Sequence, residues 1–145
     1  MIKTLLACMA ALVSHFSLAN DTVLLGCWQT TYQLEFFADG RTTKSANLCE
    51  MDFDDERFTT RCKSSAGGSV YVYGYQITRP GVFEATVESS SAYPKLVGSV
   101  RKAAYRIEGG LLYIAVVPTV NPARPAPAPI KVESVSSKMV CKTSV

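Results

Sequence analysis

Histidine is almost missing from these 145 residues, since His15 is the only one. It lies in an N-terminal segment that we expect to be cleaved, which leaves a domain without imidazole. Catalysis by Ser-His-Asp or Cys-His groups is thereby excluded, as are the common zinc sites that contain histidine. Carboxylate pairs and Ser-Lys dyads stay chemically possible, but nothing in the sequence shows that such groups meet. We expect a protein that is not an enzyme and holds no metal and no cofactor.

A strong charge of either sign is missing as well. The chain has 15 Lys and Arg residues against 12 Asp and Glu residues, and loss of Lys3 with the cleaved segment leaves a net charge of +2. Without a basic stripe, this balance excludes a nucleic-acid partner. The one acidic cluster lacks the central glycine and terminal glutamate of a calcium-binding loop, so we expect no metal there. The cluster consists of Asp52, Asp54, Asp55 and Glu56.

No apolar run is long enough to cross a bilayer, which takes about 18 to 20 residues. Residues 1–19 instead have the pattern of a secretory signal peptide: Lys3, an apolar core over Leu5–Val13, and small residues at Ser17-Leu18-Ala19. We predict cleavage before Asn20, no membrane span afterwards, and a periplasmic or secreted protein. Lipidation of Cys8 is an alternative, although only seven residues precede it.

Four cysteines follow this segment, and an exported small domain with four cysteines is typical of two disulfides. Successive cysteines are separated by 21, 12 and 78 residues, which argues against a four-cysteine zinc site. A two-residue loop at Asp55-Glu56 would place Cys49 directly opposite Cys62 in a hairpin, within disulfide distance. This register predicts Cys49–Cys62 and leaves Cys27 for Cys141.

Sustained helical periodicity is also missing. Short runs rich in Val, Ile, Tyr, Phe and Thr alternate with turn signals and predict about nine strands. A disulfide between the first and last strands fits a closed sheet. We therefore predict one all-β domain over residues 20–145, an antiparallel up-and-down barrel or strongly curved sheet. The expected strands are Leu24–Thr31, Tyr32–Ala38, Arg41–Ala46, the two around the Asp55-Glu56 loop, Val70–Thr78, Val82–Glu88, Val97–Ile107, Leu111–Val117 and Ile130–Cys141.

The segment Pro118–Pro129 holds five prolines in twelve residues. Such a segment cannot lie inside a sheet and favours an extended, polyproline-II-like loop. We interpret it as a stiff surface connection, and a binding element for a partner is the alternative.

Gly26-Cys27-Trp28 resembles the G-x-W of the first strand in lipocalins and related calycins. The resemblance implies a barrel with Trp28 at its closed end and a small apolar molecule inside. Tyr71, Tyr73 and Tyr75 alternate along one strand and so share a face. Together with Trp28 and Phe36, they are our candidate ligand-binding residues, with an exposed recognition patch or ordinary core packing as alternatives.

Two functions remain open. One is a small exported barrel that binds an apolar or amphipathic ligand. The other is a periplasmic or secreted protein-binding module, such as an enzyme inhibitor or a toxin-immunity protein, with another envelope or secreted protein as its partner. They differ in whether the interior of the barrel is hollow or filled by side chains.

Overall fold

The computed structural model describes residues 21–46, 48–65, 67–118 and 127–142. The predicted signal peptide and residues 119–126 of the proline-rich loop lie outside this part of the chain. The described residues form nine antiparallel strands and two short 3-10 helices. Their bounds are η1 Thr22–Leu24, β1 Gly26–Phe36, β2 Thr42–Ala46, β3 Leu48–Phe53, β4 Arg57–Ser64, β5 Gly67–Arg79, β6 Val82–Ser90, η2 Pro94–Leu96, β7 Val100–Glu108, β8 Leu111–Val116 and β9 Lys131–Met139.

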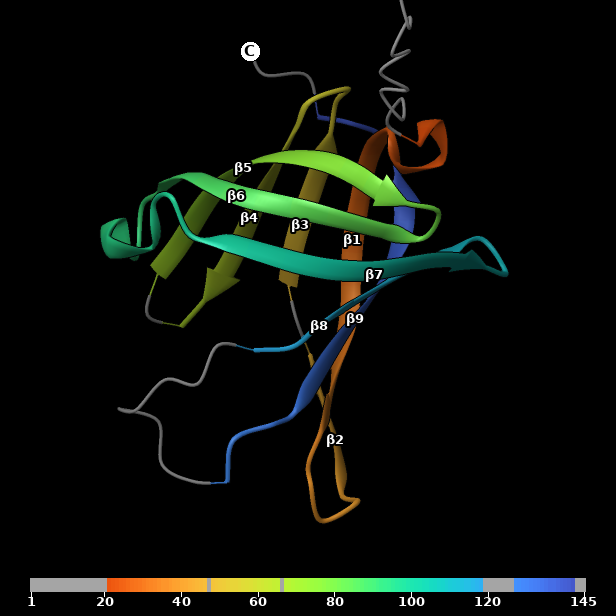
Figure 1. Cartoon of the computed structure of the whole chain (residues 1–145), viewed down its shortest axis with the longest axis vertical. Coiled ribbons are helices and arrows are strands. Elements are labelled where there is room, and N and C mark those ends of the chain that lie inside the picture. The colour runs from red at the N-terminus through yellow and green to blue at the C-terminus, as the bar shows by residue number, and fades with distance from the viewer. Residues whose placement is uncertain (1–20, 47, 66, 119–126, 143–145) are drawn as a thin grey trace, which may run out of the picture.

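The sheet closes because β1 pairs with both β3 and β9. Strands β3 to β9 follow one another as neighbours, so eight strands form a barrel. The ninth strand, β2, pairs with the second half of β1 and extends below the barrel (Figure 1). This architecture confirms the predicted all-β class and the closure of the first strand on the last.

Strand β1 corrects the sequence-based prediction of two separate strands over residues 24–38. It runs unbroken from Gly26 to Phe36, and its register against β9 shifts between Thr30 and Tyr32. The shift leaves Thr31 as an extra residue, the arrangement of a β-bulge. Because side chains alternate between the two faces of a strand, one extra residue reverses which positions face inward.

Both predicted disulfides are confirmed. Cys49 lies directly opposite Cys62 in the β3–β4 hairpin. The second bond joins Cys27 to Cys141, which lies two residues beyond the end of β9. In the hairpin, the Asp54 carboxylate accepts hydrogen bonds from the backbone N–H groups of Glu56 and Arg57. This contact explains how the unfavoured loop pair Asp55-Glu56 is held in a tight turn.

One end of the barrel is filled by large side chains. Leu24 before β1 and inward-facing residues of β1 and β3 to β8 pack there into a single cluster. Ring contacts connect Phe53 to Tyr75, Tyr75 to Phe83, and Phe83 to Tyr105, all with centroids 5.6 to 5.8 Å apart. The helix η1 adds Leu24, which is fully buried. We call this region the closed end.

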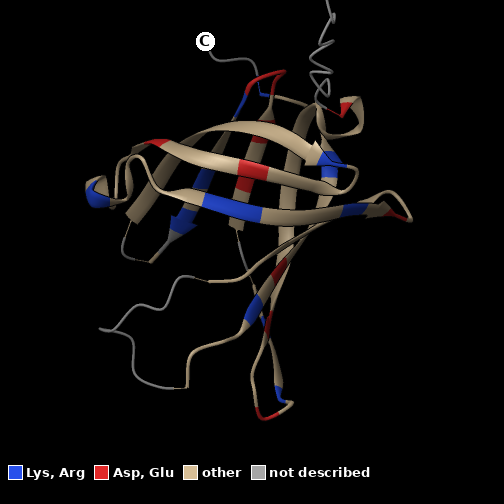
Figure 2. Cartoon of the chain, in the orientation of Figure 1, with Lys and Arg blue, Asp and Glu red and all other residues tan. Residues whose placement is uncertain are grey.

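Among the described residues, no helix is long and apolar enough to cross a bilayer. Charged side chains of both signs are scattered over the strands and turns (Figure 2).

Candidate functional site: a cavity in the barrel

Next to the closed end, the barrel holds a cavity of about 400 Å³ that opens to solvent on one side. All eight barrel strands and the segment around η2 contribute to its wall. Most of the lining side chains are apolar or aromatic, and within the part of the chain that the structure describes Arg101 is the only charged one among them. The lining residues are Thr30, Gln33, Cys49, Met51, Phe58, Thr60, Cys62, Tyr71, Tyr73, Phe83, Ala85, Tyr93, Leu96, Arg101, Ala103, Ile114, Val116, Val132 and Ser134.

Two of the predicted ligand-binding residues, Tyr71 and Tyr73, lie in this wall. Their rings stack on each other with centroids 6.1 Å apart, as expected for neighbours on one face of β5. The ring of Tyr73 also stacks on Phe58 of β4, at 4.5 Å. Burial raises the pKa of Tyr73, and the positive charge of Arg101 partly offsets this effect. The hydroxyl therefore stays protonated at neutral pH and can donate a hydrogen bond.

Tyr75 shares the inward face but lies deeper than the cavity, among the side chains of the closed end. Its hydroxyl donates a hydrogen bond of 2.8 Å to the backbone carbonyl of Asp54. Burial raises the pKa of Tyr75 to about 12. These contacts make Tyr75 a part of the core, and the structure does not bring it to the cavity wall.

Trp28 also belongs to the closed end, where its side chain is buried. The indole Nε1–H donates a hydrogen bond of 2.8 Å to the carbonyl of Leu24, which ties η1 to the barrel. The ammonium of Lys138 lies 4.3 Å from the centre of the ring and also donates to the carbonyl of Leu25. Trp28 is thus the plug that the lipocalin resemblance implies, and it does not line the cavity.

Phe36 does not line the cavity either, and the bulge at Thr31 gives the physical reason. Without the extra residue, Phe36 would share the inward face of Trp28. With it, Gln33 reaches the cavity wall, and Phe36 lies beside Lys131, whose ammonium is 3.9 Å from the ring centre. A bulge has no strong sequence signal, so nothing in the sequence indicated that Phe36 faces away from the cavity.

Sequence reasoning missed the charged member of the wall, Arg101. On β7 the inward positions alternate as 101, 103 and 105, and Ala103 and Tyr105 are buried. Because side chains two residues apart on a strand share a face, the apolar Ala103 was a sequence signal that Arg101 also faces inward.

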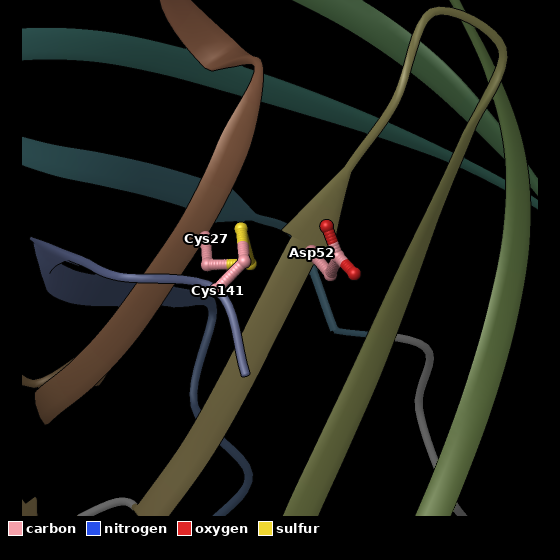
Figure 3. Close-up of side chains that lie close together, drawn as sticks. All are labelled: Cys27, Asp52 and Cys141. Atoms are coloured by element: carbon pink, nitrogen blue, oxygen red, sulfur yellow. A yellow bond between two sulfur atoms is a disulfide. The ribbon is translucent and has the colours of Figure 1, made fainter. Parts of the chain in front are cut away.

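A further cluster of polar atoms lies outside the barrel wall. The two sulfur atoms of Cys27 and Cys141 and the Asp52 carboxylate come within 4.8 Å of one another (Figure 3). Both sulfur atoms are joined in the disulfide, so neither is a thiolate that could bind a metal ion. This cluster therefore offers a metal only one carboxylate.

Two solved structures of bacterial proteins are similar to this chain. A lipocalin-like protein from Bacteroides uniformis ATCC 8492 superimposes with a TM-score of 0.51 and 14% identity, over 80% of this chain and 98% of that one. The fold is lipocalin-like. An uncharacterized protein from Bacteroides eggerthii DSM 20697 has a TM-score of 0.49 and 13% identity, over 78% of this chain and 98% of that one. No protein-family model and no curated protein match the sequence.

Proposed function

We propose that this protein is exported and binds a small apolar or amphipathic molecule in the cavity of its barrel. The observation that carries the proposal is the hollow half of a barrel whose other half is filled. A volume of about 400 Å³ falls within the usual range for small-molecule pockets, about 300 to 1,000 Å³. Its wall combines apolar side chains with a few polar groups, as such pockets do.

Export is supported by the two disulfides, because such bonds persist in oxidising compartments and are rare in the cytosol. The pattern of residues 1–19 supports the same conclusion. The denatured mass of the protein taken from its own host tests it. We expect a chain that starts at Asn20 and lacks four hydrogens, and a mass with a lipid attached at Cys8 would overturn it.

Native mass spectrometry of the same gently isolated protein tests ligand binding. The expected result is a small adduct that disappears on denaturation and gives the mass of the ligand. A protein without an adduct that also fails to take up an apolar fluorescent probe would contradict the proposal.

The substitution Ala103→Phe locates the bound molecule. Ala103 lies in the cavity wall and is 2% exposed, so a phenyl ring there would occupy the ligand's space. We expect apolar probe binding to fall at least about tenfold, whereas Ala104→Phe, on the outward face of β7, leaves it unchanged. Val116→Phe would fill the same cavity from β8, and it replaces Ala103→Phe in this test if that variant does not fold. Equal binding by all of these variants would place the ligand elsewhere.

A second function, protein binding, is favoured by strand β2. All five of its residues are exposed, and within the described chain β2 pairs only with β1. An exposed strand edge of this kind can pair with a strand from another protein. In the native mass spectrum, a retained protein in place of a small adduct would support this function.

A further inference from the structure

Arg101 is placed so that its side chain extends into the barrel. It lies directly opposite Ala85 of β6, and Ala85 in turn lies opposite Tyr75 of β5. Residues opposite each other in an antiparallel pair project to the same face. Because Ala85 is small and buried, it leaves space above it for the long side chain of Arg101. Both Arg101 and Ala85 line the cavity.

Among the described residues, no carboxylate forms an ion pair with Arg101, in contrast to Arg57 of β4 and Arg106 further along β7. Arg57 pairs with Glu88 at 2.7 Å, and Arg106 pairs with Glu133 at 3.0 Å. None of the described residues that line the cavity is an aspartate or a glutamate. A half-buried guanidinium that faces an apolar cavity without an acidic partner has capacity to bind an anion from outside.

The surroundings of Arg101 divide the cavity into a polar and an apolar part. Arg101 lies near the beginning of β7, and Tyr93 and Leu96 come from the segment just before that strand. Tyr93 is 60% exposed, so this segment forms the rim of the cavity. Further along β7, Ala103 is buried beside the closed end. A long apolar group would therefore point inward while a charged group stays near the rim.

From this arrangement we propose that the ligand is an anionic amphiphile whose carboxylate binds the guanidinium of Arg101 and whose hydrocarbon part fills the inner cavity. This inference rests on the proposed function and specifies its ligand class. The protonated hydroxyl of Tyr73, close enough for Arg101 to act on it electrostatically, is a second donor for the same carboxylate.

Two probes that differ in one charge test the inference: cis-parinaric acid and its methyl ester, whose fluorescence rises on transfer to an apolar site. We expect the wild-type protein to bind the acid at least about tenfold more tightly than the ester, the usual advantage of a hydrogen bond to a charged group. Arg101→Gln should remove this preference by lowering the affinity for the acid to about that for the ester, and Arg101→Lys should restore part of it.

Lys102→Gln is the matched control, because it removes the same charge from the next residue, which is exposed and lies opposite Glu84. It should bind both probes like the wild type. Equal wild-type affinity for acid and ester would overturn the role of Arg101 and leave the apolar cavity in place. If the wild type bound neither probe, the proposed function would fail together with the inference. A melting temperature for each variant shows that it is folded.

Discussion

The two halves of the barrel use aromatic side chains in different ways. At the closed end, the indole of Trp28 and the hydroxyls of Tyr75 and Tyr105 each donate a hydrogen bond to a protein oxygen. In the hollow half, Tyr71 and Tyr73 stack on neighbouring rings in a wall that borders open space. Buried polar groups need partners, and those at the closed end find them within the protein.

This difference separates stability from binding within one small domain. The closed end also holds the N-terminal segment in place: Asp21 caps η1 through the N–H of Val23 and accepts a hydrogen bond from Tyr105. Side chains there contact each other on all sides, so their loss would leave a void. Side chains of the hollow half already border a void, so their loss should affect ligands more than folding.

The largest test of this comparison is Trp28→Ala against Tyr71→Ala. Removing a buried tryptophan should lower the free energy of unfolding by about 3–5 kcal/mol, from lost burial and the cavity left behind. Tyr71 is half-buried beside an existing cavity, so its loss should cost about 1 kcal/mol. Urea unfolding of both variants measures the difference. Similar losses would mean that the hollow half is as tightly packed as the closed end.

The second-largest expected effect is a loss of stability at alkaline pH, caused by the tyrosines of the closed end. Burial raises the pKa of both Tyr75 and Tyr105 to about 12, and the hydrogen bond to Asp21 adds to the effect on Tyr105. Tyrosines in the unfolded chain lose their protons near pH 10, before the folded ones do. Stability is therefore full below pH 10 and falls as pH rises toward 12, by an amount on the order of 2 kcal/mol for each tyrosine.

Thermal melts across this pH range measure the effect, with two variants for comparison. The double variant Tyr75→Phe/Tyr105→Phe should show a shallower loss of stability than the wild type. Tyr113→Phe should not, because Tyr113 lies on the outer face of β8 beside Arg106. A double variant as steep as the wild type would show that the closed end does not cause the alkaline loss.

The smallest expected difference is between Tyr75→Phe and Tyr73→Phe. The first removes the hydroxyl that satisfies the carbonyl of Asp54 and should lower the free energy of unfolding by about 1 kcal/mol. The second removes a hydroxyl at the cavity and should leave stability nearly unchanged while weakening binding of cis-parinaric acid. If urea unfolding showed a larger loss of stability for Tyr73→Phe than for Tyr75→Phe, the division between the two halves would be contradicted.

Local chemistry made several features predictable from the sequence. The β class follows from short β-branched and aromatic runs between turn residues, and the Cys49–Cys62 bond follows from a hairpin register counted outward from Asp55-Glu56. The same alternation correctly put Tyr71 and Tyr73 on one face. The choice of Phe36 as a ligand-binding residue was wrong, because the bulge at Thr31 reverses the inward face of β1 without changing the residue pattern.

The sequence by itself determined the all-β class, both disulfides and the shared face of the tyrosines, since each depends on spacing along the chain or on the count of cysteines. Only the tertiary structure decided which part of the barrel is filled and which is hollow. That outcome depends on how side chains from eight strands share one interior volume. For the same reason, the position of Arg101 over Ala85 became visible only when the strands were placed beside one another.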